Sequence, residues 1–95
     1  MNFQHTEDAA LDGFRRALRA ALVAQFGADA ASLDDDTKLF TGGLIDSLSV
    51  MDLVTFVERE LGKRVPPAAI TLENFDSIAQ IVAFARTLGG ARQPT

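Results

Sequence analysis

Apolar residues recur at steps of three and four positions in three stretches of the chain, a spacing that predicts three amphipathic helices. The first stretch runs from Glu7 to Gly27, and glycine is a common stop signal for a helix. Thr6 is a candidate cap, but the early Gly13 weakens the first turns. We therefore expect this helix to begin between Glu7 and Asp12. Its buried face is predicted to hold Leu11, Phe14, Leu18, Leu22 and Phe26.

The second stretch, Leu48 to Leu61, has the widest apolar surface in the sequence, and Gly62 ends it. Asp46 is a good N-cap, because a carboxylate accepts hydrogen bonds from the first free N–H groups of a helix. Ser47 is then expected in the first turn, near the positive end of the helix dipole. An apolar surface wider than one core-facing stripe cannot be buried completely. Partial exposure beside Ser47 is expected for some of Leu48, Met51 and Phe56.

The third stretch follows an extended break at Val65-Pro66-Pro67. Ala68 to Phe75 is predicted to be irregular or a helix of one to two turns. The last helix is expected to start after Asp76 or Ser77, where Ser77 and Gln80 have the spacing of a capping box. Its predicted buried stripe is Ile78, Ile81, Val82, Ala85 and Leu88. With no strand pattern, the predicted fold class is all-α: a small bundle of three main helices and one short helix.

Residues 28–46 have no periodic pattern, and a loop of this length in a small domain is usually functional. We expect its scattered leucine and phenylalanine side chains to hold it against the bundle. Asp34-Asp35-Asp36 suggests a calcium loop, but an EF-hand needs glycine at its sixth position and glutamate at its twelfth. Those positions are Leu39 and Ile45 here, so no metal site is predicted.

The chain of 95 residues is predicted to form one domain, residues 7–88, between flexible ends at 1–6 and 89–95. It has no cysteine, which excludes disulfides and cysteine-based metal or redox sites. The first eight residues lack the basic and apolar regions of a signal peptide, and no apolar run is long enough to span a membrane. These features are compatible with the cytoplasm, which is the location that we expect.

A net charge of −4 argues against nucleic acid as a partner, because binding to phosphates relies on clustered Lys and Arg. The acids concentrate in Asp34-Asp35-Asp36 and in the second helix, at Asp52, Glu58 and Glu60. Such charges are usually a solvated face that keeps a domain soluble. The alternative is a docking surface for basic partners.

Ser47 lacks the partners of a catalytic serine. The only histidine is His5, near the N-terminus, and no G-x-S-x-G turn surrounds Ser47, so a hydrolase would have no general base. A glycine loop with lysine for nucleotide phosphates is also absent from the sequence. Helix N-termini do favour phosphate, so a serine at this position suits a lasting phosphodiester.

Asp46-Ser47-Leu48, within Gly43 to Leu48, resembles the signature of acyl and peptidyl carrier proteins. The resemblance covers roughly residues 8 to 88. Its further matching segments are Asp36 to Phe40, Leu53 to Leu61, Val65-Pro66 and Phe75 to Ile78.

This resemblance implies that a phosphopantetheinyl transferase uses coenzyme A to attach 4′-phosphopantetheine to Ser47, between Asp46 and Leu48. The thiol of that arm would hold an acyl or aminoacyl group as a thioester, so a cysteine-free chain borrows its sulfur. Such a carrier catalyses nothing and raises the effective concentration of its cargo at a docked enzyme. The implied partners are the transferase, a loading ligase or acyltransferase, and downstream synthase or tailoring enzymes. Nucleic acid and membranes are not implied, and a monomer is expected.

In such families, acids of the second helix meet basic patches on partner enzymes. The matching positions are Asp46, Asp52 and Glu58, with Leu48 and Met51 as apolar contacts. Docking of this kind is weak and sensitive to salt.

Several positions depart from primary fatty-acid carriers. Ser49 and Arg59 stand where acids are usual, Thr55 and Phe56 replace smaller or unbranched apolar residues, and Ala68 to Asn74 is distinctive. These departures favour a discrete carrier of a specialised pathway, such as polyketide, nonribosomal peptide, aminoacyl or modified-malonyl synthesis. A primary fatty-acid carrier and a helical adaptor without the arm are the alternatives.

Overall fold

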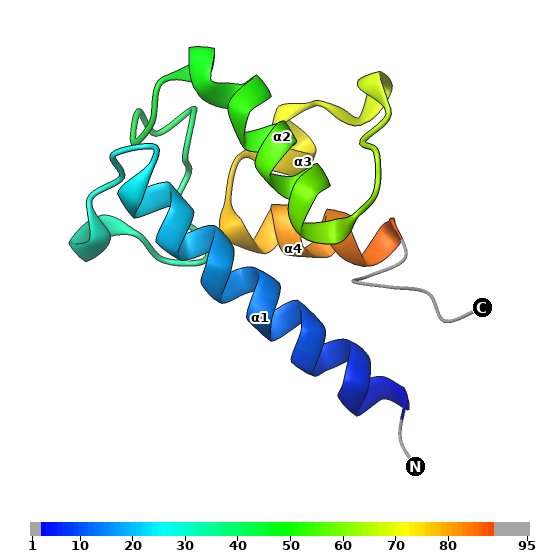
Figure 1. The fold of residues 1–95 in the computed structure, drawn as a ribbon. Coiled ribbons are helices and arrows are strands. Elements are labelled where there is room, and N and C mark those ends of the chain that lie inside the picture. The colour runs from blue at the N-terminus through cyan, green and yellow to red at the C-terminus, as the bar shows by residue number, and fades with distance from the viewer. Residues whose placement is uncertain (1–2, 89–95) are drawn as a thin grey trace.

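The computed structural model describes residues 3–88, with side chains from Ala9 onward, and it is built from helices (Figure 1). The four α-helices are α1 (Phe3–Ala24), α2 (Val50–Leu61), α3 (Leu72–Phe75) and α4 (Ile78–Thr87). Three short 3-10 turns connect them: η1 (Ala30–Ser32), η2 (Ser47–Ser49) and η3 (Pro67–Ala69). The described residues contain no strand, and the predicted all-α bundle of three main helices and one short helix is confirmed. The expected tail, 89–95, lies outside the described residues.

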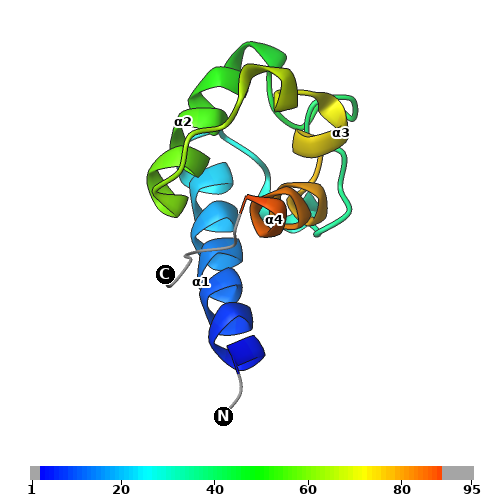
Figure 2. The ribbon, with the colours of Figure 1, turned by 90° about the vertical axis from the view of Figure 1, so that its right-hand side faces the viewer.

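The start of the first helix was predicted wrongly. α1 begins at Phe3 rather than between Glu7 and Asp12, so Thr6 lies inside the helix and does not cap it. Among the side chains that the structure describes, Ala9 is exposed and Leu11 is the first that is buried, which is also where the apolar pattern of the sequence starts. In Figures 1 and 2 the first turns of the α1 ribbon extend beyond the other helices.

The core draws on every α-helix and on the long loop. α4 packs against α1 and α3, and the rings of Phe75 and Phe84 lie 5.6 Å apart between centroids. Phe84 and Phe56 are buried beyond the stripes predicted from the sequence. The largest fully buried side chains among the described residues are Phe75, Leu18, Leu22, Leu33, Leu39, Leu53, Ile78, Ile81 and Val57. Burial of apolar surface at this density supplies the main favourable term in folding.

The loop between α1 and α2 is held against the bundle, as predicted, but polar contacts contribute as well. Leu33, Leu39 and Ile45 are buried. The Arg19 guanidinium donates to the backbone oxygens of Leu33 and Ala30, at 2.5 and 3.4 Å. Arg15 forms an ion pair of 2.9 Å with the Asp35 carboxylate, and the Asp35 carbonyl accepts from the Ala79 N–H at 2.9 Å. The loop therefore contacts both α1 and α4.

The predicted C-terminal end of the second helix and the predicted start of the last helix are confirmed, whereas the predicted stop of the last helix at Gly89-Gly90 lies outside the described residues. Gly62 ends α2 in the left-handed conformation, with φ of 67°. Ser77 caps α4, because its Oγ accepts from the Gln80 N–H at 3.1 Å. The capping box is one-sided, since Gln80 Oε1 is buried without a hydrogen-bond partner in the described part of the chain. Four of the five residues of the predicted α4 stripe are buried, and Leu88 is half-buried.

Candidate functional site

Asp46 opens the helical segment that carries Ser47, as its side chain predicted. Its backbone is extended, and its Oδ1 accepts from the Leu48 N–H at 3.0 Å. The Asp46 carbonyl also accepts from the Ser49 N–H at 2.9 Å. These bonds close a 3-10 turn rather than the first turn of an α-helix, because α2 itself begins at Val50. Ser47 thus lies just ahead of α2, in the 3-10 turn η2.

Ser47 differs from the other serines of the chain. It is exposed, and its hydroxyl makes no hydrogen bond within the described residues. The Ser32 hydroxyl donates to the Asp29 carboxylate at 3.1 Å, Ser49 is half-buried, and Ser77 is buried as the cap of α4. Ser47 is therefore the serine whose oxygen an approaching enzyme can reach most directly.

The apolar side chains that follow Ser47 divide between solvent and core. Leu48 is 86% exposed and Met51 is 55% exposed, which is high for large apolar residues. Phe56 is 8% exposed and belongs to the core. Of the three candidates, the first two therefore form an exposed apolar pair beside the serine.

Asp76 holds the loop that leads to Ser47, and sequence reasoning missed this role. Its Oδ1 accepts from the N–H groups of Phe40 and Thr41, at 2.7 and 3.1 Å, and its Oδ2 accepts from the Thr41 hydroxyl at 2.6 Å. The Asp76 carbonyl accepts from the Leu39 N–H at 2.7 Å. Asp76 was noted only as a possible helix start, because a side chain's partner 35 or more residues away leaves no local signal.

The Asp76 carboxyl is buried, with 4% of its surface exposed. Burial raises its pKa, but the hydrogen bonds from Thr41 and Phe40 and the charge of Lys38 outweigh burial, so the pKa lies below the ordinary 3.8. Asp76 is therefore ionised at neutral pH and accepts charge-assisted bonds.

Two adjacent glycines, Gly42 and Gly43, shape the turn between Thr41, which Asp76 binds, and Ser47. A Cβ on Gly42 would lie 2.5 Å from the backbone oxygen of Lys38, closer than real contacts allow. Gly43 has φ of 76°, a conformation that other residues rarely adopt. The turn then closes with the Ile45 N–H donating to the Leu39 carbonyl at 2.9 Å, which brings the chain to Asp46.

The acids proposed for docking have different surroundings. Asp46 and Asp52 are exposed. Glu58 is half-buried, and its Oε2 accepts from the Val65 N–H at 2.8 Å, so this carboxylate also holds the break after α2. The side chain of His5 lies outside the described residues, and no group of three or more possible metal ligands occurs among the residues that are described.

The sequence model of the family described as "Phosphopantetheine attachment site" matches residues 16–85, a range that contains Ser47 and its supporting loop. The chain belongs to this family. It is a phosphopantetheine-binding carrier: it bears a 4′-phosphopantetheine group, is modified by phosphopantetheinyl transferases, and serves partner enzymes without catalysing a reaction. No curated protein matches the carrier closely enough to be reported as a relative. Within residues 3–88, no helix has the length and apolar character that crossing a membrane requires.

The surroundings of Ser47 fit the carrier's prosthetic group. Ser47 is exposed and its hydroxyl makes no hydrogen bond within the described chain, so a group could be esterified to it without breaking an internal bond. The neighbouring Leu48 is exposed as well and does not cover the serine with a packed side chain. When bound, the group supplies a thiol for thioester chemistry.

Proposed function

We propose that Ser47 is the residue that carries the 4′-phosphopantetheine arm. In the attachment step the Ser47 oxygen forms a bond to phosphorus, and the phosphoanhydride bond of coenzyme A breaks. Adenosine 3′,5′-bisphosphate leaves, and the hydroxyl proton passes to a base on the transferase. The observation that supports this assignment best is that Ser47, unlike Ser32 and Ser77, is exposed with its hydroxyl unpaired.

Asp46 and Leu48 support the attachment in different ways. Asp46 fixes the turn through its bond to the Leu48 N–H, so the serine is presented in one backbone conformation. Leu48 offers an exposed apolar contact for the enzyme that approaches Ser47. Removing Asp46 would loosen the position of the hydroxyl without removing it.

The loaded arm holds an acyl or aminoacyl group as a thioester, and the carrier delivers this group to a docked enzyme. We propose that Met51 and Leu48 supply the apolar part of the docking surface and that Asp52 supplies its charge. Glu58 contributes charge to the same helix, although its bond to Val65 restricts its movement. Association through such a surface is fast, weak and sensitive to salt.

We further propose that the carrier serves a specialised pathway in the cytoplasm, such as polyketide or nonribosomal peptide synthesis. Arg59 is exposed at a position where primary fatty-acid carriers usually have an acid, and this favours different partners. Residues 68–74 form the end of η3 and the start of α3. A primary fatty-acid carrier remains the alternative function. The mass of the cargo on the arm, measured on protein from the native host, distinguishes the two.

The attachment is tested by intact mass spectrometry after incubation with coenzyme A and a broad-specificity phosphopantetheinyl transferase. We expect the chain to gain the mass of one phosphopantetheine. Ser47→Ala should gain nothing, whereas the matched control Ser49→Ala, two positions away, should still be modified. An unmodified wild type that still binds its partner would favour an adaptor without the arm, and an equal gain in Ser47→Ala would place the arm elsewhere.

A further inference from the structure

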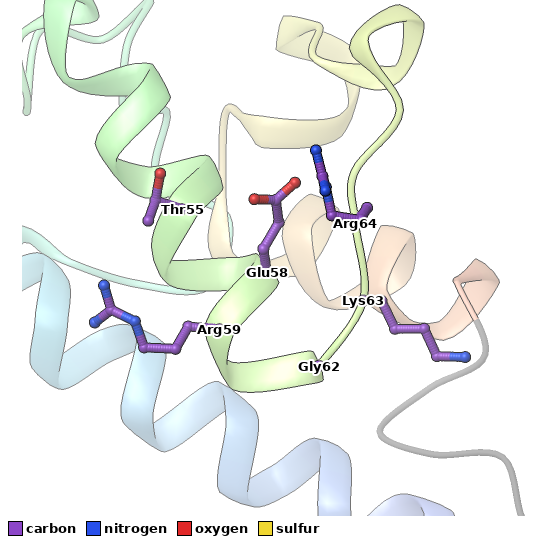
Figure 3. A pocket seen from close by; sticks show the side chains of 6 residues that line it. All are labelled: Thr55, Glu58, Arg59, Gly62, Lys63 and Arg64. Atoms are coloured by element: carbon purple, nitrogen blue, oxygen red, sulfur yellow. The ribbon is translucent and has the colours of Figure 1, made fainter.

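Three cationic side chains gather at the end of α2, away from Ser47. Arg59 belongs to the last turn of the helix, and Lys63 and Arg64 follow its end. They line a shallow hollow of about 330 Å³, together with Thr55, Glu58 and Gly62 (Figure 3). The hollow therefore has three positive charges and one negative charge, on a chain whose net charge is −4.

None of these three cations forms an ion pair or a side-chain hydrogen bond within the described residues. Glu58 is the acid nearest to them in the lining, but its Oε2 accepts from the Val65 backbone. Glu60, the other acid in this half of α2, is not part of the lining. The charges of Arg59, Lys63 and Arg64 thus have no partner in this part of the fold.

The cations do not converge on one point. In Figure 3 the side chains of Arg59 and Lys63 extend to opposite sides of the end of α2, and Arg64 extends in a third direction from the segment that follows the helix. A single phosphate or carboxylate would reach one of them at a time. An acidic segment of another protein, which has several carboxylates along its length, can reach more than one of them.

The cationic end is continuous with the acidic end of the same helix. A second hollow, of about 220 Å³, is lined by both Asp52 and Arg59 and shares Thr55 and Arg59 with the first. Asp52 and Arg59 are seven positions apart, which corresponds to about 10 Å along a helix. One exposed face of α2 therefore changes sign along its length.

We propose that α2 is a bipolar docking surface: its partner enzymes place basic residues against Asp46 and Asp52 and an acidic segment against Arg59, Lys63 and Arg64. The proposal rests on the function proposed above, since it assigns the partner's chemistry to the carrier's docking helix. A uniformly acidic helix can meet a basic patch in either direction along its axis. A bipolar helix fits in one direction, which fixes where Ser47 and its arm point.

Cations at a helix C-terminus also interact favourably with the helix dipole, and this role alone would require no partner. The two roles are distinguished by binding. ¹⁵N NMR of the full holo chain is recorded during titration with hexaglutamate, and separately with hexalysine. We expect hexaglutamate to shift the amide signals of residues 59–64 and hexalysine to shift those of residues 46–52, both effects weakening with salt.

The matched variants are Arg59→Gln/Arg64→Gln, the charge-preserving Arg59→Lys/Arg64→Lys, and Arg16→Gln on the exposed face of α1 as the control. The Gln pair should weaken hexaglutamate binding about fivefold, given the modest contribution of each exposed pair. The Lys pair and the Arg16 control should bind as the wild type does.

Shifts spread evenly over the chain, or unchanged binding by the Gln pair, would overturn the proposal. Tighter binding of a hexanucleotide than of hexaglutamate would indicate nucleic acid and would also overturn it. Modification of Ser47 is measured in parallel by mass. A Gln pair that gains the arm but loses hexaglutamate supports both proposals, whereas failure of the wild type to gain the arm counts against the carrier function alone.

Discussion

A single methyl group at position 42 has no room in this fold, whereas one at position 13 has ample room. The Cβ of an alanine at 42 would meet the Lys38 backbone oxygen at 2.5 Å, and backbone cannot move aside as a flexible side chain can. A Cβ at Gly13, inside α1, meets nothing within 4 Å. The same substitution is therefore expected to have opposite effects at these two glycines.

We predict that Gly42→Ala lowers the free energy of unfolding by roughly 1–3 kcal/mol, the usual cost of overpacking. Gly13→Ala should raise it by about 1 kcal/mol, because alanine is the better helix former. Urea denaturation followed by circular dichroism measures both values. A Gly42→Ala protein as stable as the wild type would mean that the turn before Ser47 has another conformation.

At the same scale, Asp76 makes stability depend on pH. The pKa of Asp76 in the folded protein is below the ordinary 3.8. The contribution of the carboxylate to the free energy of unfolding is therefore complete above pH 3.8 and is lost as the pH falls through the folded pKa. Asp76→Asn should lower the free energy of unfolding by roughly 2 kcal/mol at neutral pH, through loss of charged hydrogen bonds. The difference between wild type and variant should shrink as the pH falls below about 4.

Denaturation of both proteins between pH 7 and pH 2 tests this dependence. A difference that stays constant over that range would show that the Asp76 charge contributes nothing. The variant should also be modified more slowly at Ser47, because the loop before the serine loses its anchor on Phe40 and Thr41.

At the scale of elements, α3 and α4 both have a hydroxyl residue at the N-cap position, but only one of the two forms a capping bond. Ser77 Oγ accepts from the Gln80 N–H at the start of α4 and is buried. Thr71 occupies the same cap position in α3, but its side chain makes no capping bond. The two hydroxyl residues therefore form a natural pair of test and control.

Ser77→Ala is expected to lower the free energy of unfolding by about 1 kcal/mol, the typical contribution of an N-cap. Thr71→Ala should change it by less than half of that amount. Thermal denaturation of the two variants compares them directly. Equal losses would mean that the capping bond of Ser77 contributes nothing to stability, because Thr71 makes no such bond.

Local signals in the sequence predicted some element ends and not others, since α1 ends at Ala24, before the predicted stop at Gly27. Three ends could be predicted because each depends on groups within a few residues: the caps Asp46 and Ser77 and the stop at Gly62. The residue type at each of these positions is itself the signal. The predicted start of α1 was wrong, because the apolar pattern of the sequence becomes regular only from Leu11, the first buried side chain among those described. The 3-10 geometry at Ser47 has no distinct apolar pattern and was not predicted.

At the scale of the whole molecule, the contacts that position the site join segments that are distant in sequence. Asp76 bonds to Phe40, and Asp35 bonds to Arg15 and Ala79. Sequence alone placed Ser47 and the acids of α2, but not these bonds, because each requires knowledge of how the helices pack. The sequence showed Arg59 only as a base where related carriers have an acid, and it did not predict the hollow that Arg59 lines with Lys63 and Arg64.

The bond between Asp76 and the loop also limits how carriers can be recombined. A chimera that replaces only residues 36–49 with those of another carrier changes the hydrogen-bond donors of the loop but keeps their acceptor, the Asp76 carboxylate. If the incoming loop lacks a hydroxyl at the position of Thr41, one oxygen of a buried anion loses its 2.6 Å bond. Grafts that exchange the loop together with the α3–α4 junction should keep the serine in place. The segments to exchange together are therefore those that contact each other in the fold, even where they are far apart in the sequence.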